Sequence, residues 1–80
     1  MTLSVYLPVG VWTEVTDADS YFQGIENYEL KIHEGATLPT DSSDFKIALP
    51  KRIYVFEPVT GNKLYAKCEE HNGTISYELM

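Results

Sequence analysis

The residues best suited to metal or nucleophile chemistry lie near the end of this 80-residue sequence. Cys68 and His71 have a Cys-x-x-His spacing, and His33 is the second histidine. A structural zinc site needs about four ligands, commonly several cysteines, and the chain has one cysteine. Cys68 also alternates in phase with Leu64 and Ala66. We therefore expect Cys68 to be a buried apolar side chain rather than a ligand or a nucleophile.

Acidic residues suggest a second kind of site. Asp17 and Asp19 begin like a calcium-binding loop, but Phe22 stands where an EF-hand has glycine, and Tyr28 where it has a bidentate glutamate. The sequence contains no glycine-rich phosphate loop, nucleophile elbow or zincin motif. We expect no catalytic residue, no metal and no cofactor, and a protein that is not an enzyme.

The charge of the chain restricts its partners. There are 12 acidic and 6 basic residues, which gives a net charge of −6. Nucleic acids and anionic membrane surfaces are bound by clustered lysines and arginines, so we expect neither as a partner. The longest run of large apolar residues, Ile53–Phe56, is far shorter than the roughly 20 that span a bilayer. The first residues lack the basic and apolar regions of a secretion signal, which predicts synthesis in the cytoplasm.

Apolar and polar residues alternate with a period of two along most of the chain, which is typical of half-buried strands. We predict a single domain over 1–80 that is all-β: a small antiparallel β-sandwich or jelly-roll-like barrel of about eight short strands. The predicted strands are 3–8, 11–16, 20–24, 28–33, 45–49, 51–57, 63–69 and 74–79.

Turn residues suggest how the last strands pair. Asn72-Gly73 is the pair that a type I′ turn requires, because both central residues need a positive φ. Pro58 to Asn62 contains the residues of a hairpin loop. We therefore predict that the last three strands form a meander of two hairpins.

One of these strands is apolar on both faces. In 51–57, Ile53 and Val55 point one way, and Tyr54 and Phe56 point the other. A two-sheet sandwich buries one face of each strand, so the other face needs a cover. Another subunit, the 34–44 loop and a ligand are the three alternatives.

If another subunit covers this face, we assign the subunit contact to aromatic side chains, because they bury a large area with few rotatable bonds. The predicted interface residues are Tyr54, Phe56, Tyr65 and Trp12.

The layout of the chain resembles that of small proteins from the structural gene clusters of tailed bacteriophages. The segments that carry the resemblance are Trp12–Val15, Tyr21–Gln23, Tyr28–Ile32, Leu38–Asp41, Arg52–Phe56, Leu64–Lys67 and Gly73–Glu78. The resemblance implies an all-β virion protein, either a capsid-decoration or a tail-associated component, that is often a trimer and binds a larger virion protein.

Two further functions are open at this point. Trp12, Tyr54 or Tyr65 could form the stacking surface of a small carbohydrate-binding module of a tail fibre. The acidic residues could mimic DNA in a small inhibitor, although they are scattered among turns. A chain of 80 residues buries only roughly 60% of the surface that it exposes when unfolded. If the chain is a virion protein, this small buried fraction favours a homo-oligomer.

Overall fold

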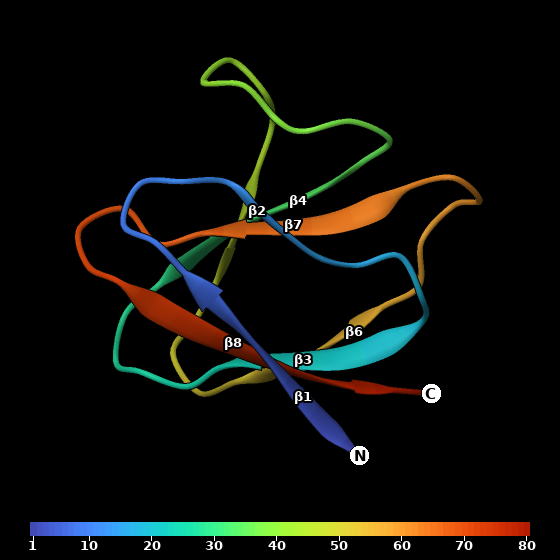
Figure 1. The fold of residues 1–80 in the computed structure, drawn as a ribbon, viewed down its shortest axis with the longest axis horizontal. Coiled ribbons are helices and arrows are strands. Elements are labelled where there is room, and N and C mark those ends of the chain that lie inside the picture. The colour runs from blue at the N-terminus through green and yellow to red at the C-terminus, as the bar shows by residue number, and fades with distance from the viewer.

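The computed structural model describes residues 1–80 and consists of eight strands joined by loops (Figure 1). The strands are β1 (Thr2–Leu7), β2 (Thr13–Thr16), β3 (Ser20–Gly24), β4 (Leu30–Gly35), β5 (Lys46–Ala48), β6 (Ile53–Phe56), β7 (Lys63–Lys67) and β8 (Gly73–Leu79). The structure has no helix long and apolar enough to cross a membrane.

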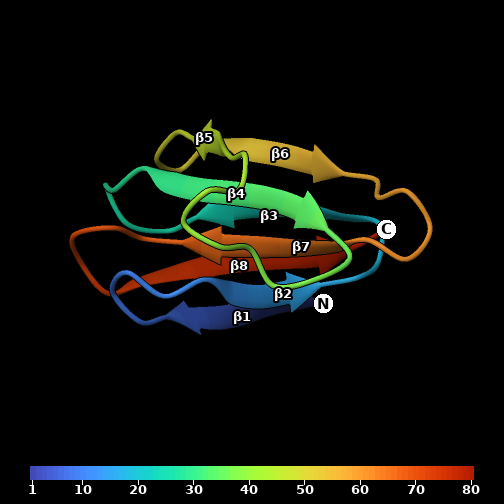
Figure 2. The same ribbon diagram turned by 90° about the horizontal axis from the view of Figure 1, so that it is seen from above.

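The strands form two antiparallel four-stranded sheets that pack face to face. The first sheet has the order β1-β8-β3-β6 and the second the order β2-β7-β4-β5. β1 and β2 pair with β8 and β7, while β3 and β4 pair with β6 and β5. This winding of one long antiparallel ribbon is that of a jelly roll, so the predicted fold class is confirmed. Seen from above, β5 and β6 lie together at one side of the sandwich, and β1 and β2 at the other (Figure 2).

The core lies between the two sheets and is small. Each strand contributes the side chains of one face, as the period-two alternation predicts. The ten buried residues are Leu7, Val15, Phe22, Leu30, Ala48, Phe56, Leu64, Ala66, Cys68 and Ile75. Cys68 is a free thiol inside this cluster, which confirms that it packs as an apolar side chain.

The predicted meander is wrong, although each predicted strand overlaps an observed one. β6 pairs with β3, β7 pairs with β2 and β4, and β8 pairs with β1 and β3. The loops at 57–62 and 68–72 cross from one sheet to the other instead of closing hairpins. The physical reason is burial, because the apolar faces of β7 and β8 cover each other only from opposite sheets.

The predicted type I′ turn is also wrong. Gly73 does not have a positive φ; it is the first residue of β8 and pairs with Leu7. The Asn72 side chain instead accepts a hydrogen bond from the Val9 N–H at 2.9 Å, which ties together two loops at the same end of the sandwich. The glycine that needs its conformational freedom in this half of the chain is Gly61, with a φ of 91° in the β6–β7 loop.

These backbone conformations predict opposite costs for two alanine substitutions. Gly61→Ala forces an L-residue into a left-handed conformation, so we expect a loss of about 1 kcal/mol in the free energy of unfolding. At Gly73 an added Cβ would lie 3.4 Å from the Cys68 Cβ, an ordinary contact. We therefore expect Gly73→Ala to change stability less. Urea denaturation of both variants measures the difference, and a larger loss for Gly73→Ala would contradict the assigned backbone.

Candidate functional site

The residues first considered for metal chemistry do not form a site. Cys68 points into the core, whereas the His71 ring stacks on Tyr28 in the loops, with the ring centroids 4.1 Å apart. No group of three or more His, Cys, Asp and Glu side chains is placed to hold a metal ion. Asp17 and Asp19 are exposed in the β2–β3 turn.

The two faces of β6 are reversed relative to the predicted interface. Tyr54 and Phe56 point into the sandwich: Phe56 is only 5% exposed, and the Tyr54 ring stacks on Phe22. Ile53 and Val55 point outward and are 65% and 54% exposed. The strand does have two apolar faces, but the aromatic side chains fill the core because they are the larger ones. The assignment of the contact surface to Tyr54 and Phe56 is therefore corrected to Ile53 and Val55.

Tyr65 and Trp12 lie on the outer side of the second sheet, and Tyr65 is only 3% exposed. The His33 ring lies between them, 6.1 Å from the Trp12 ring and 6.3 Å from the Tyr65 ring. The Lys67 Nζ lies 5.0 Å from the centre of the Trp12 ring. Tyr65 is therefore unavailable as a contact surface, and Trp12 is half-buried.

The loop between β4 and β5 covers part of this side of the second sheet (Figure 2). The His33 Nδ1–H donates a hydrogen bond of 2.6 Å to the Asp44 carbonyl, and the Phe45 ring lies 4.4 Å from the Lys31 Nζ. The covering loop that the sequence offered as an alternative thus accounts for β7. It does not account for the outer side of β6, which belongs to the first sheet.

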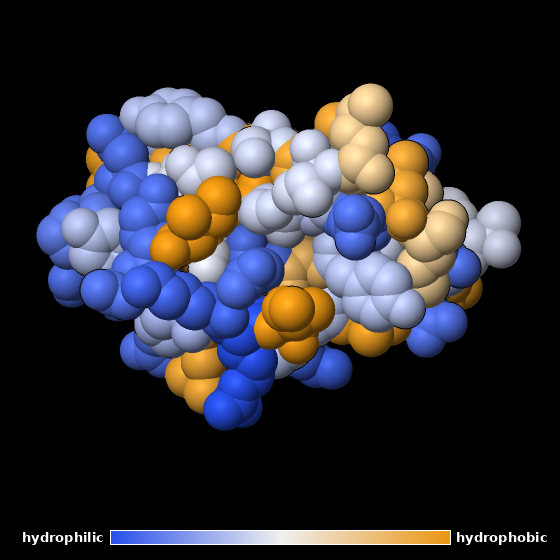
Figure 3. Space-filling model, turned by 90° about the horizontal axis from the view of Figure 1, so that it is seen from below, coloured by the Kyte–Doolittle hydropathy of each residue, from blue (hydrophilic) through white to orange (hydrophobic).

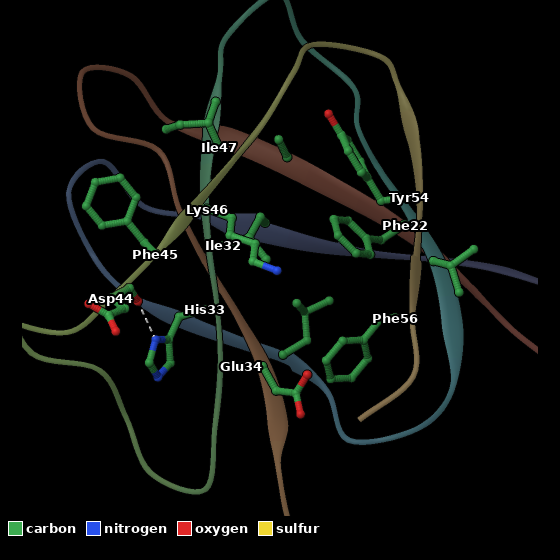
Figure 4. A pocket seen from close by; sticks show the side chains of 13 residues that line it. Phe22, Ile32, His33, Glu34, Asp44, Phe45, Lys46, Ile47, Tyr54 and Phe56 are labelled. Carbon is green, nitrogen blue, oxygen red and sulfur yellow. Dashed lines mark hydrogen bonds between the residues drawn. The ribbon is translucent and has the colours of Figure 1, made fainter. Parts of the chain in front are cut away.

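A groove of about 540 Å³ opens between β5 and β6, which are neighbouring edge strands of different sheets. Its volume lies within the range of about 300–1,000 Å³ that is usual for small-molecule sites. Apolar side chains from five strands form its floor, and Figure 4 shows several of them pointing into the same space. The floor residues are Phe22, Ile32, Ala48, Tyr54, Phe56 and Leu64.

Charged groups stand at the rim of this groove. Lys46 pairs with Ile32, so the two side chains share the inner face, and in Figure 4 the Lys46 nitrogen points into the groove. Glu34 lies at the end of β4, and its Oε2 accepts hydrogen bonds from the Val59 N–H at 3.0 Å and the Asn62 Nδ2 at 2.9 Å. The Asn62 hydrogen bond, followed by that of Val59, lowers the pKa of Glu34 below its ordinary value of 4.5.

Comparison of the chain with protein-family models, with curated proteins and with solved structures finds no match. An apolar groove with one inward ammonium can bind a ligand, and an exposed strand edge can bind another chain.

Sequence reasoning missed the groove because it assigned 45–49 as an ordinary strand. The signal was present in Phe45-Lys46-Ile47, where Lys46 stands directly opposite Ile32, a residue whose side chain faces the core. Such a residue is recognised as inward-pointing only once the strand pairing is known, because an apolar–polar–apolar triplet also fits the opposite orientation.

The hydrogen bonds of Glu34 predict a pH dependence of stability. A carboxyl whose pKa is lowered in the folded state stabilises the fold above its unfolded-state pKa, and this contribution is lost as the pH falls through the folded pKa. We expect Glu34→Gln to lower stability at neutral pH and to flatten its decline below about pH 4.5. Urea denaturation between about pH 7 and about pH 3 measures both effects.

The matched control is Glu57→Gln, because the exposed Glu57 side chain makes no hydrogen bond or ion pair. This variant should follow the wild-type pH profile. If Glu34→Gln does so as well, the carboxylate of Glu34 does not hold the β6–β7 loop.

Proposed function

We propose that the chain is a non-enzymatic structural protein of a tailed-phage particle, either a capsid-decoration or a tail-associated component, that self-associates and binds a larger virion protein. The observation that carries the self-association is β6, an edge strand with a free backbone edge and an exposed apolar side. The virion role and the trimer are what the sequence resemblance implies.

Three of the four edge strands have features that discourage pairing with another chain. β2 contains a register shift between Glu14 and Thr16, and β5 is only three residues long with Lys46 turned inward. β1 is regular, but two of its three outward side chains, Thr2 and Ser4, are polar. Short edges, bulges and inward charges are the devices by which sheets avoid edge-to-edge association. β6 has a regular register and no charge, proline or bulge within it.

The outer β6 face, which we define as Tyr21, Ile53 and Val55, provides the apolar contact. Tyr21 and Val55 are directly opposite each other on β3 and β6, and all three side chains are exposed. Figure 3 looks onto this side of the first sheet and shows apolar side chains interrupted by hydrophilic ones. A mixed surface of this kind fits an association that depends on concentration, and exposed charges of one sign weaken it unless salt screens them.

The sugar-binding alternative loses its proposed platform. Tyr65 is buried, and the Trp12 ring lies beneath the Lys67 ammonium. One face of the Tyr54 ring is stacked on Phe22, and the ring lies on the floor of the groove rather than on the protein surface. The three rings therefore do not form the exposed stacking surface that a sugar-binding module uses.

Sedimentation of the purified chain over a range of concentrations tests the self-association. We expect species larger than the 9.1 kDa monomer, more of them at higher salt, and a trimer as the largest abundant one. Val55→Lys places a charge in the outer β6 face and should weaken association at least about tenfold, or about 1.4 kcal/mol. Its melting temperature should change little, because the side chain is exposed.

Val11→Lys is the matched control, since Val11 is 50% exposed in the loop after β1, the opposite edge of the first sheet from β6. This variant should associate like the wild type. Particles purified from cells that carry the gene should contain the wild type and Val11→Lys at a fixed copy number, and less of Val55→Lys. A chain that is monomeric at every concentration and salt, or absent from the particles, contradicts the proposal.

A further inference from the structure

One of the two inward positions of β5 holds a charged side chain. Lys46, paired with Ile32, takes this position, the other being the buried Ala48, while Phe45 and Ile47 are exposed to solvent. A strand of a sandwich normally turns its apolar side chains to the core, as the neighbouring strand β4 does with Leu30. The cationic end of Lys46 is thereby held over an apolar floor (Figure 4).

No acidic group of the protein forms an ion pair with this ammonium. Lys31 and Lys67 pair with Glu69, and Lys63 pairs with Glu14, but Lys46 has no carboxylate within 4.0 Å. The charge of Lys46 contributes to lowering the pKa of Glu34, but the Glu34 Oε2 already accepts two hydrogen bonds from the β6–β7 loop.

Asp44 and His33 also line the groove, and they are joined to each other through the Asp44 carbonyl and the His33 Nδ1. The Asp44 carboxylate and the Lys46 ammonium are thus the two charged groups of the groove that have no hydrogen bond or ion pair. Of these two groups, the Lys46 ammonium is the one that points over the apolar floor (Figure 4).

We propose that this groove binds a monocarboxylate with an apolar body, such as a medium-chain fatty acid. The carboxylate pairs with the Lys46 ammonium, and the chain lies on the floor between Ile32, Tyr54 and Phe56. Charge complementarity selects the head group, because an anion forms a charge-assisted hydrogen bond there, whereas a second ammonium would be repelled. Burial of methylene groups supplies the remaining affinity, about fourfold for each one buried.

The proposal does not rest on the self-association. The groove lies between the two sheets and shares only Val55 with the outer β6 face, whose other residues, Tyr21 and Ile53, lie outside the groove. A structural role for Lys46 is the competing explanation, because an inward charge protects an edge strand from pairing. The two roles predict different results for one substitution.

Octanoate is the probe, and two-dimensional NMR titration of the full chain is the readout. We expect saturable shifts at Ile32, Lys46, Ala48 and Tyr54, with octanoate binding at least about tenfold more tightly than octylammonium. Lys46→Met keeps the length of the side chain and removes its charge, so it should weaken octanoate binding about tenfold to a hundredfold. Lys46→Arg should retain most of the affinity.

Lys51→Met is the matched control, because Lys51 is an exposed lysine that makes no ion pair and lies outside the groove. It should bind octanoate like the wild type. Equal octanoate affinity in the wild type and in Lys46→Met, or shifts that map elsewhere, would overturn the proposal. The proposal would also be overturned if the wild type does not bind octanoate. If Lys46→Met then forms larger species, the role of Lys46 is to protect the edge strand from pairing. A monomeric wild type that binds octanoate contradicts the proposed self-association alone.

Discussion

β5 and β6 each lack a strand partner on one side, and they lie next to each other in different sheets. The winding of the chain requires this arrangement. β3 pairs with β6 in the first sheet and β4 pairs with β5 in the second, so the loop from β5 to β6 crosses from one sheet to the other. At this side of the sandwich two strand edges therefore meet without hydrogen bonds between them, as the edges of β1 and β2 do at the opposite side. The groove and the outer β6 face are both consequences of that open side.

The size of the core explains why this side stays open. Ten buried residues fill the space between the sheets, and Ala48 is the one core side chain that β5 provides. An apolar residue in place of Lys46 would line the groove with apolar surface, but it would leave β5 without a charge against pairing. The chain instead keeps a lysine there and places its large aromatic residues, Phe22, Tyr54 and Phe56, beneath the opening.

The strands and their inward faces were predictable, whereas their partners were not. Alternation identified Leu64, Ala66 and Cys68 as buried, because burial of one face imposes a period of two on the sequence. Asn72-Gly73 led to the wrong prediction of a hairpin, because a local turn signal carries no information about which sheet the next strand joins. The faces of β6 could not be told apart by alternation, since both are apolar. The difference between them is one of volume, as Tyr54 and Phe56 fill the core better than Ile53 and Val55 do.

The central claim is that β6 is the edge through which this protein meets a partner of its own kind. Hydrogen–deuterium exchange of the backbone amides, measured at low and at high protein concentration, tests it directly. β1 is an internal reference, because it is the other edge strand of the same sheet and pairs only with β8. The account predicts that exchange in Ile53–Phe56 slows as the concentration rises while exchange in Thr2–Leu7 stays the same. Exchange in β6 that is independent of concentration, or slowing confined to β1, would contradict it.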